Sequence, residues 1–327
     1  MVFLFGSAVD GGTAGDPQEL HCQSNRVAAR LHPMLSFAQV DVFTAEPYRG
    51  NPVAVVLGAD AMSDEAMAQF ANWTNLSETT FVLKPTVAEA DYRVRIFTPS
   101  SELPFAGHPT IGTCHAWLKA GGDPASEGTV VQECGVGLVT LRQGGGRLAF
   151  AAPPLLRSGP VDSADLAKAC EVLDIAPQEV VDSQWADNGP GWLAIRLASA
   201  EAVLSLEPNW TAAKGYDIGV VGPHPIGVVA TTGSPGPTGS SAAEDPAIEV
   251  RAFFRANEAP VEDPVTGSLN AALAQWLLAD GTLTAPYVAS QGTAIGRAGR
   301  VFVEQADGEI WVGGDAVTAI IGEVALG

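Results

Sequence analysis

The chain of 327 residues is poor in cysteine and in basic residues, and it has no long apolar run. Its four cysteines, Cys22, Cys114, Cys134 and Cys170, are scattered without CxxC spacing, which indicates neither a zinc site nor a disulfide framework. A reducing cytoplasm fits this pattern. No stretch approaches the roughly 20 apolar residues of a membrane helix. The opening MVFLFGSAV is too short for a secretory signal, and no basic residue precedes it.

The charge balance excludes two classes of partner. Only 17 Lys and Arg stand against 37 Asp and Glu, which gives a formal net charge of −20. Nucleic acids and anionic membranes would repel such a chain, so we expect neither as a partner. The sequence also lacks a glycine-rich dinucleotide fingerprint, a phosphate-binding loop and a cluster of metal ligands. We therefore expect no cofactor and no metal.

A strongly apolar helix pattern is present at residues 262–281. Apolar residues recur there with helical period, and no charge lies between Asp263 and Asp280. Asp263 suits an N-cap, Pro264 the first helical position and Gly281 a C-terminal stop. A helix that is apolar on nearly every face needs cover all round, so we predict that strands wrap it. Only its N-terminus, which attracts anions, is expected to be open.

A similar segment occurs earlier in the chain. Shifting residues 95–118 by 156 positions gives six identities, Arg95 on Arg251, Phe97 on Phe253, Glu102 on Glu258, Pro104 on Pro260, Thr110 on Thr266 and Ala116 on Ala272. Both segments run as a strand, a turn with Glu and Pro, and a helix that closes at glycine. We predict two similar halves, each with one central helix.

The remaining patterns predict an α+β fold of two pseudo-equivalent halves, each a curved, mainly antiparallel sheet wrapped around a central helix. The halves are expected at 36–152 and 153–327, with the last strand a candidate to complete the first half, and the proline-rich residues 152–160 suit a linker. The polar residues 1–35 are expected to be a disordered extension. A protein that starts at Met34 is expected to keep its melting temperature and its activity.

Individual elements follow from local patterns. Helices are expected at 64–73, capped by Ser63, at 108–120, and at 163–173, capped by Ser163. Residues 47–57 are expected to be a turn followed by a strand, and further strands are expected at 36–43, 79–83, 92–98, 129–131, 137–141, 147–150, 192–199, 226–233, 248–254, 288–290, 300–304, 309–313 and 316–322. Residues 234–247 have the composition of a loop.

Three polar residues stand at the ends of predicted elements: Glu78 before a strand, His108 at the start of the first central helix and Asp263 at the start of the second. Taken singly, each has an ordinary explanation as a strand-end charge, a helix start or an N-cap. If the two helix starts face each other, they form one pocket between the halves. Free N–H groups at Thr110, Gly267 and Ser268 would then hold a substrate carboxylate.

Five motifs together resemble the PhzF-like phenazine-biosynthesis isomerases. They are NPVAVV (51–56), NLSETTFV (75–82), LPFAGHPTIG (103–112), EDPVTGS (262–268) and SQGTAIGR (290–297), in order from about residue 36 to the C-terminus. The resemblance implies the diaminopimelate epimerase fold, with the site between two halves. It also implies that Glu78 is the proton-transferring acid/base and that His108 and Asp263 bind and polarise the substrate. Gly107 and Ser268 would line the pocket.

The same resemblance excludes one mechanism. Relatives with epimerase activity of the diaminopimelate type use two cysteines at the helix starts, whereas GHPTIG and EDPVTGS contain none, and Cys114 lies inside the helix. GHPT also replaces the commoner GHGT or GHAT, and residues 1–35 have no counterpart in the family.

The leading hypothesis is a cofactor-independent isomerase that shifts a proton on a small carboxylate-bearing substrate, active as a homodimer. A carboxylate suits this role if burial raises its pKa toward neutrality. Two alternatives stay open. One is an amino-acid racemase or epimerase, with Asp263 or His108 as the second acid/base. The other is a non-catalytic small-molecule binding protein on the same scaffold.

Overall fold

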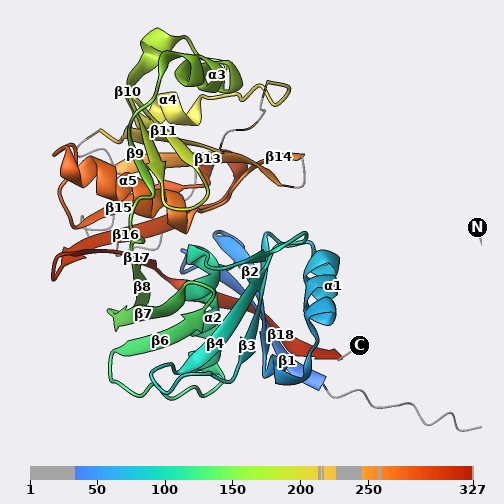
Figure 1. Cartoon of the computed structure of the whole chain (residues 1–327). Coiled ribbons are helices and arrows are strands. Elements are labelled where there is room, and N and C mark those ends of the chain that lie inside the picture. The colour runs from blue at the N-terminus through green and yellow to red at the C-terminus, as the bar shows by residue number, and fades with distance from the viewer. Residues whose placement is uncertain (1–33, 213–214, 216, 226–244, 257–258, 326–327) are drawn as a thin grey trace, which may run out of the picture. The chain divides into compact units, whose positions relative to one another are not determined.

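Two series of strands follow each other along the chain, and each closes around one helix (Figure 1). Helix α2 (Gly107–Lys119) lies among the blue and green strands, and helix α5 (Gly267–Ala279) among the yellow and orange ones. The computed structural model describes residues 34–212, 215, 217–225, 245–256 and 259–325. Residues 1–33, expected to be disordered, and residues 226–233, expected to be a strand, lie outside the described residues. The expected loop at 234–247 lies outside them as well, except for its end.

The first series contains ten elements in the order β1 to β8 with two helices inserted. They are β1 (Met34–Val42), β2 (Asn51–Leu57), α1 (Asp64–Thr74), β3 (Glu78–Leu83), β4 (Tyr92–Phe97), β5 (Glu102–Leu103), α2, β6 (Thr129–Cys134), β7 (Gly137–Gly144) and β8 (Arg147–Ala151). The second series begins with β9 (Arg157–Pro160) and α3 (Ser163–Leu173). It continues with β10 (Val180–Asp187), β11 (Trp192–Leu197), α4 (Ala200–Leu204), β12 (Asp217–Pro223), β13 (Ile248–Ala256), β14 (Ala259–Glu262), α5, β15 (Tyr287–Gln291), β16 (Gly299–Ala306), β17 (Glu309–Gly314) and β18 (Ala316–Ala325).

The strand pairings repeat between the two series. Strand β2 pairs antiparallel with β1 and parallel with β3, and β11 pairs in the same way with β10 and β12. Strand β4 is antiparallel to β3 and β5 and parallel to β6, and β13 has the same relation to β12, β14 and β15. The predicted α+β class with two similar halves is confirmed.

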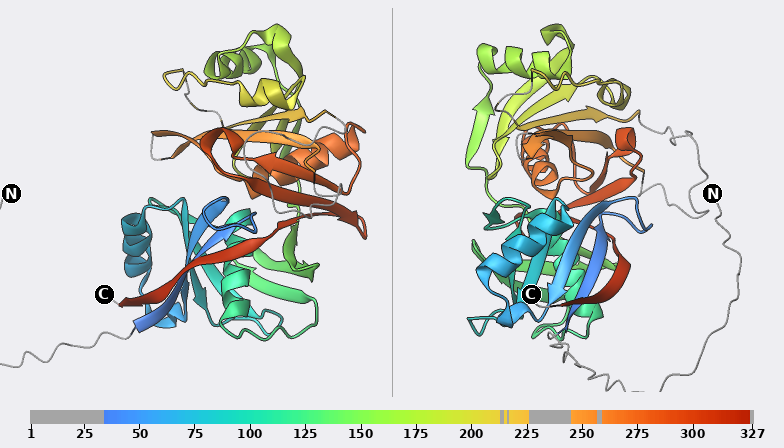
Figure 2. Two further views of the ribbon diagram at one scale, coloured as in Figure 1. Left: turned by 180° about the vertical axis from the view of Figure 1, so that it is seen from behind. Right: turned by 90° about the vertical axis from the view of Figure 1, so that its right-hand side faces the viewer.

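Each series also gives a strand to the other. After β8, strand β9 pairs antiparallel with β10 of the second series, and after β17, strand β18 pairs with β1 of the first. Strands β8 and β17 pair with each other. The views in Figure 2 follow β18 from the second series back along β1. The exact boundary at 152/153 stays a prediction.

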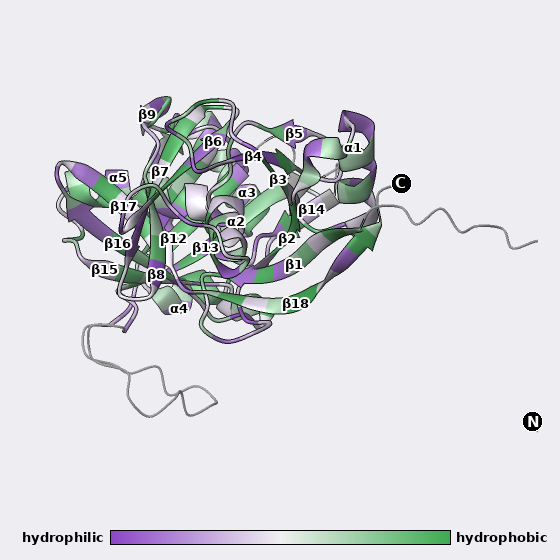
Figure 3. Cartoon of the chain, turned by 90° about the horizontal axis from the view of Figure 1, so that it is seen from below, coloured by the Kyte–Doolittle hydropathy of each residue, from purple (hydrophilic) through white to green (hydrophobic). Residues whose placement is uncertain are grey.

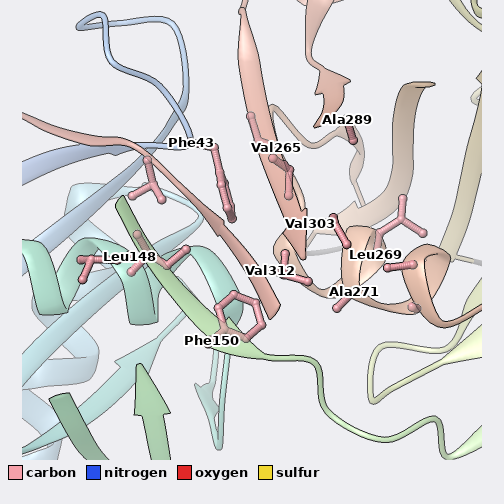
Figure 4. Packing of buried hydrophobic residues seen from close by; sticks show 14 of the residues in the cluster. Phe43, Leu148, Phe150, Val265, Leu269, Ala271, Ala289, Val303 and Val312 are labelled. Atoms are coloured by element: carbon pink, nitrogen blue, oxygen red, sulfur yellow. The ribbon is translucent and has the colours of Figure 1, made fainter. Parts of the chain in front are cut away.

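Both central helices are buried, α5 with side chains that are apolar on nearly every face and α2 with polar His108, Thr110 and Thr113 among its buried residues. Nine of the thirteen residues of α5 are buried, and α2 buries nine as well. Gly112 lets α2 approach β2, because a Cβ there would lie 2.3 Å from Val53 Cγ1. One hydrophobic cluster contains Ile111 of α2 and Leu269 of α5, and Figure 4 shows part of it. The packing thus joins both helices to one core.

The other predicted helices form as amphipathic surface elements. Ser63 caps α1 by accepting a hydrogen bond from the Ala66 N–H, as predicted, and Figure 3 shows both hydrophobic and hydrophilic residues along this helix. Helix α3 has the predicted bounds, but its cap is Asp162 and not Ser163. The carboxylate of Asp162 accepts from the N–H groups of both Ala164 and Asp165, so Ser163 is the first helical residue, one residue earlier than a Ser163 cap would allow.

The sequence repeat holds, but its predicted offset of 156 is wrong for the helices. Phe97 pairs with Glu102, five residues on, whereas Phe253 pairs with Glu262, nine residues on. The second hairpin is therefore four residues longer, and beyond it the offset is 160. Glu102 corresponds to Glu262, and Gly107, the first residue of α2, corresponds to Gly267, the first residue of α5.

The predicted N-cap role of Asp263 is also wrong. Helix α5 begins at Gly267 with Thr266 as the preceding cap residue, three residues after the expected start at Pro264. The Asp263 N–H donates to the Ala252 carbonyl of β13, and Val265 is fully buried in the core. These contacts hold residues 263–266 outside the helix, so it cannot begin at Pro264. The C-terminal stop at Gly281 is confirmed by its left-handed backbone, φ +75°.

Candidate active site

The three predicted polar residues come from three different elements. Glu78 is the first residue of β3, His108 the second residue of α2, and Asp263 lies between β14 and α5. His108 Nε2 lies 3.2 Å from Glu78 Oε2. Each of these two atoms is buried and has no hydrogen-bond partner among the described residues. An unpartnered acid beside an unpartnered base is a costly arrangement unless a ligand or a proton completes it.

The N-termini of the two central helices meet beside these residues. A Cβ on Gly107 would lie 3.2 Å from Gly267 Cα and 2.8 Å from the Phe150 ring, so only glycine fits at this point of α2. Neither helix has a side chain bonded to its first N–H groups. Two positive helix ends in one place favour an anion between them.

Burial shifts the pKa values of all three groups. Burial and the nearby charge of Asp263 raise the pKa of Glu78 to about 8. Burial lowers the pKa of His108 to about 3, so its ring is neutral at physiological pH. Burial also raises the pKa of Asp263 to about 6, against hydrogen bonds from Thr266 and Asn51 that lower it. At neutral pH the site thus holds a protonated Glu78 next to a neutral imidazole.

Both carboxylate oxygens of Asp263 are held. Asn51 Nδ2 donates to Oδ1 at 2.9 Å, and Thr266 Oγ1 donates to Oδ2 at 2.6 Å. Gln291 of β15 donates to Thr266 Oγ1 at 2.8 Å and accepts from the Thr266 N–H at 3.0 Å. The second hydrogen of the Asn51 amide goes to the Val265 carbonyl at 2.9 Å. The carboxylate therefore has a defined orientation.

The ring nitrogens of His108 have different neighbours. The Pro52 backbone raises the pKa of His108 by a hydrogen bond, and because proline has no N–H its carbonyl must be the acceptor. The Asn51 amide, 3.4 Å from Nδ1, already donates both its hydrogens elsewhere. Nε2 faces Glu78, and Nδ1 lies beside Asn51.

Among the predicted carboxylate-binding residues, Thr110 and Ser268 differ. The Thr110 N–H donates to the Ala106 carbonyl, and its hydroxyl accepts from Gln132, so this residue offers no free N–H. Ser268 is the second residue of α5 and its Oγ accepts from Trp192 Nε1 at 3.1 Å. The N–H groups near the meeting point are those of Gly107, His108, Gly267 and Ser268.

The sequence analysis missed Asp217, the first residue of β12. Thr79 of β3 pairs with Phe97, and Ile218 of β12 pairs with Phe253, the counterpart of Phe97. Thr79 and Ile218 are therefore equivalent, and so are the residues that precede them. Asp217 thus occupies the position of Glu78. Burial and the charge of Asp187 raise its pKa to about 6. Only the strand pairing reveals this match, because residues 78 and 217 share no motif.

The Asp217 side chain lies on the face of β12 that packs against α5. Two residues on, a Cβ at Gly219 would lie 2.3 Å from Leu269 Cδ1, and residues two apart share a face of a strand. Asp217 is also the direct neighbour of Trp192, whose indole holds Ser268. Asn188 Nδ2 donates to the Ser268 carbonyl at 2.8 Å. Polar residues thus gather at the start of α5 as they do at the start of α2.

A cavity of about 380 Å³ lies elsewhere, beside the C-terminal part of α5. Its lining includes Val221, Ile248, Leu277 and Leu283, and none of the predicted site residues. Among the described residues, no group of three or more His, Cys, Asp or Glu is arranged to hold a metal ion, and none of the helices could span a membrane. The predicted pocket between the helix starts stays a prediction.

Sequence comparisons agree with the motifs. A family model described as phenazine biosynthesis-like protein matches residues 40–322. The chain is 32% identical over 304 residues to trans-2,3-dihydro-3-hydroxyanthranilate isomerase of Pseudomonas fluorescens, covering 90% of this chain and 100% of that protein. It is 43% identical over 182 residues to antisense-enhancing sequence 1 of Schizosaccharomyces pombe, covering 54% of this chain but only 62% of that protein.

A structural comparison shows the same architecture. A phenazine biosynthesis protein of the PhzF family from Enterococcus faecalis superposes with a TM-score of 0.71. The match covers 90% of this chain and 100% of that one at 22% sequence identity. At that identity the likeness concerns the fold alone.

Proposed function

The chain belongs to the phenazine biosynthesis-like protein family, and from this premise we propose that it is an isomerase that shifts a proton on a small carboxylate-bearing substrate without a cofactor. The observation that carries the proposal is the Glu78 carboxyl, 3.2 Å from a neutral imidazole, with a pKa raised to about 8. A carboxylic acid with a pKa near the working pH can both take up and return a proton. A solvent-exposed glutamate would be too weak a base.

The proposed step uses one carboxylate twice. Ionised Glu78 removes a proton from one carbon of the substrate, and the electron pair of that C–H bond is delocalised over the adjacent unsaturated system. The protonated Glu78 then returns the proton to another carbon on the same face, which regenerates the carboxylate. His108 and Asp263 bind and polarise the substrate, and no oxidant or reductant is needed.

The substrate carboxylate is proposed to lie where the two central helices meet. The N–H groups of Gly107 and Gly267 and the hydroxyl of Ser268 support this position, since helix ends favour anions. The chain as a whole carries a formal net charge of −20, so its surface elsewhere repels an anion. Asp263 then serves the opposite, non-carboxylate end of the substrate.

The pH dependence follows from the first step. Because Glu78 must start ionised, kcat/KM is expected to rise with pH through a midpoint near 8, the pKa of Glu78 in the free enzyme. An unperturbed glutamate would place this midpoint near ~4.3. A pH profile measured between 5 and 10 that is flat around 8 would contradict the role of Glu78.

One observation favours the epimerase alternative. Asp217 occupies in the second half the strand position that Glu78 occupies in the first, and its pKa is raised to about 6. An epimerase needs acid/base groups on opposite faces of one carbon, and two equivalent carboxyls could supply them. The proton shift needs only Glu78.

The test is turnover in deuterated water. The first substrate to try is trans-2,3-dihydro-3-hydroxyanthranilate, which the Pseudomonas fluorescens relative is named for, followed by a panel of cyclic and linear amino acids. Label at a new carbon supports the proton shift, and label at the original carbon with inverted configuration supports epimerisation. Binding of these compounds without any exchange would leave the scaffold a binding protein and would refute the isomerase.

A further inference from the structure

Asn51 is a polar residue beside the site, and the proposed function assigns it no role. It is the first residue of β2 and is fully buried. Its Nδ2 lies 2.9 Å from Asp263 Oδ1, 2.9 Å from the Val265 carbonyl and 3.4 Å from His108 Nδ1. One amide group thus contacts two of the three predicted catalytic residues.

The orientation of this amide is fixed by its partners. An amide nitrogen has two hydrogens and no free electron pair for bonding, and both hydrogens point at acceptors, the Asp263 carboxylate and the Val265 carbonyl. Turning the amide over would set its oxygen against the same two acceptors. The Asn51 oxygen is left buried without a partner, which marks the nitrogen contacts as the reason for this residue.

These bonds connect segments that lie far apart in the sequence. Asn51 is 212 residues from Asp263, and it reaches across from the first half to the segment that precedes α5. The other Asp263 oxygen is held within the second half, by Thr266. Asn51 therefore supplies the cross-half contact that sets the Asp263 carboxylate relative to His108, which belongs to its own half.

We propose that Asn51 is a positioning residue that aligns the Asp263 carboxylate of the second half with His108 and Glu78 of the first. The proposal deepens the proposed function, on which it rests, because alignment matters only if these groups act on one substrate. A displacement of about 1 Å in a catalytic group can lower the rate about 100-fold.

The electrostatics give the alignment a measurable consequence. The hydrogen bond from Asn51 favours the ionised Asp263, and the charge of Asp263 in turn raises the pKa of Glu78. Without Asn51, the pKa of Asp263 rises, Asp263 is less ionised near neutral pH, and the pKa of Glu78 falls. Glu262 on β14, which raises the pKa of Asp263, and the neutral His108 on α2 are unchanged by the substitution.

The first experiment uses Asn51→Ala and, as a matched control, Asn72→Ala. Asn72 also donates from Nδ2 to a carbonyl, that of Pro99 at 2.9 Å, but it lies on the exposed side of α1. Asn51→Ala is expected to lower kcat/KM about 10- to 100-fold. The midpoint of its pH profile is expected to move to lower pH by about half a unit or more. Asn72→Ala is expected to match the unmodified chain in both respects.

A second variant covers the case in which Asn51→Ala does not fold, since it leaves the Val265 carbonyl without its donor. Asn51→Thr keeps one hydroxyl donor and a β-branched shape that suits a strand. Its loss in kcat/KM is expected to lie between the two alanine variants. Folded variants at Asn51 with the rate and pH profile of the unmodified chain would overturn the proposal.

A third measurement needs neither a variant nor a substrate. In the unmodified chain, the Asn51 side-chain amide protons are expected to shift with pH in step with the Asp263 carboxyl carbon, with a midpoint near 6, in an NMR titration. Amide protons that do not follow Asp263 would overturn the positioning role. If these protons do follow Asp263 while none of the tested compounds is turned over, the isomerase proposal fails and the alignment stands.

Discussion

In the first half, the strand residue that faces the central helix is Glu78, and the helix residue beside it is His108; in the second half, the same positions hold Asp217 and Ser268. The pKa of Glu78 is raised to about 8, whereas that of Asp217 reaches about 6. Equivalent backbones thus carry one group poised for proton transfer near neutral pH and one that is mostly ionised there. The two halves share a backbone arrangement, and a few side chains give them different acid/base properties.

A second equivalent pair differs in burial and not in chemistry. Arg95 binds Glu102 through two hydrogen bonds, and Arg251 binds Glu262 in the same way. The first pair is partly exposed, with 42% of the Glu102 side chain accessible, whereas Arg251 and Glu262 are 5% and 8% exposed. Arg251 also donates to two backbone carbonyls of the α4 region. The same ion pair is a surface contact in one half and a core element in the other.

The largest expected effect tests the difference between Glu78 and Asp263. Glu78→Gln keeps the shape but removes the acid/base, so kcat is expected to fall about 10²- to 10⁴-fold with little change in substrate binding. Asp263→Ala is expected to weaken binding and turnover together. Steady-state kinetics and calorimetric binding separate the two outcomes. Full turnover by Glu78→Gln would contradict the acid/base role of Glu78, and the family resemblance would then inform on the fold alone.

The next effect concerns the two ion pairs. Glu262→Ala leaves the Arg251 charge buried and unpaired, and it is expected to reduce the free energy of unfolding by about 3–5 kcal/mol. Glu102→Ala is expected to cost about 0–1 kcal/mol, because Arg95 is near solvent and keeps its contact with Asp64. Urea unfolding of both variants checks the comparison. Equal losses would mean that the difference in burial has no energetic weight.

The smallest effect concerns Asp217. Asp217→Asn is expected to change kcat/KM less than about tenfold if Glu78 alone transfers the proton; a larger loss would favour the epimerase.

Because the folded-state pKa of Asp217 is raised, its contribution to stability falls as pH rises from its usual range through about 6. The stability of Asp217→Asn relative to that of the unmodified chain should therefore be higher at pH 8 than at pH 4, by on the order of 1 kcal/mol. Urea unfolding at these two pH values measures the gain.

Local patterns predicted most of the fold. Apolar periodicity located α5, the internal repeat located α2, and the glycines at 121 and 281 marked their ends. The start of α5 was predicted three residues too early. Asp263 and Pro264 form an acceptable local helix start, and the alternative depends on contacts to β13 and on the buried Val265.

Local sequence patterns predicted only part of the candidate site. Motifs selected Glu78, His108 and Asp263, and their roles stay predictions. The motif NPVAVV contained Asn51, but nothing in it indicated a bond to a residue 212 positions away. Asp217 was missed because it lies 139 residues after Glu78 and not 156: more residues separate β12 from β13 than separate β3 from β4.

By itself, the sequence determined two apolar central helices, the strands around them, the family motifs and the strong negative charge, since each depends on composition or on neighbours along the chain. The tertiary structure alone decided that the two helix starts meet at Gly107 and Gly267, that Asn51 holds Asp263 and that Glu78 faces His108. It also decided the pKa values, because the desolvation of a carboxyl or an imidazole depends on every segment packed around it, whatever its distance in the sequence.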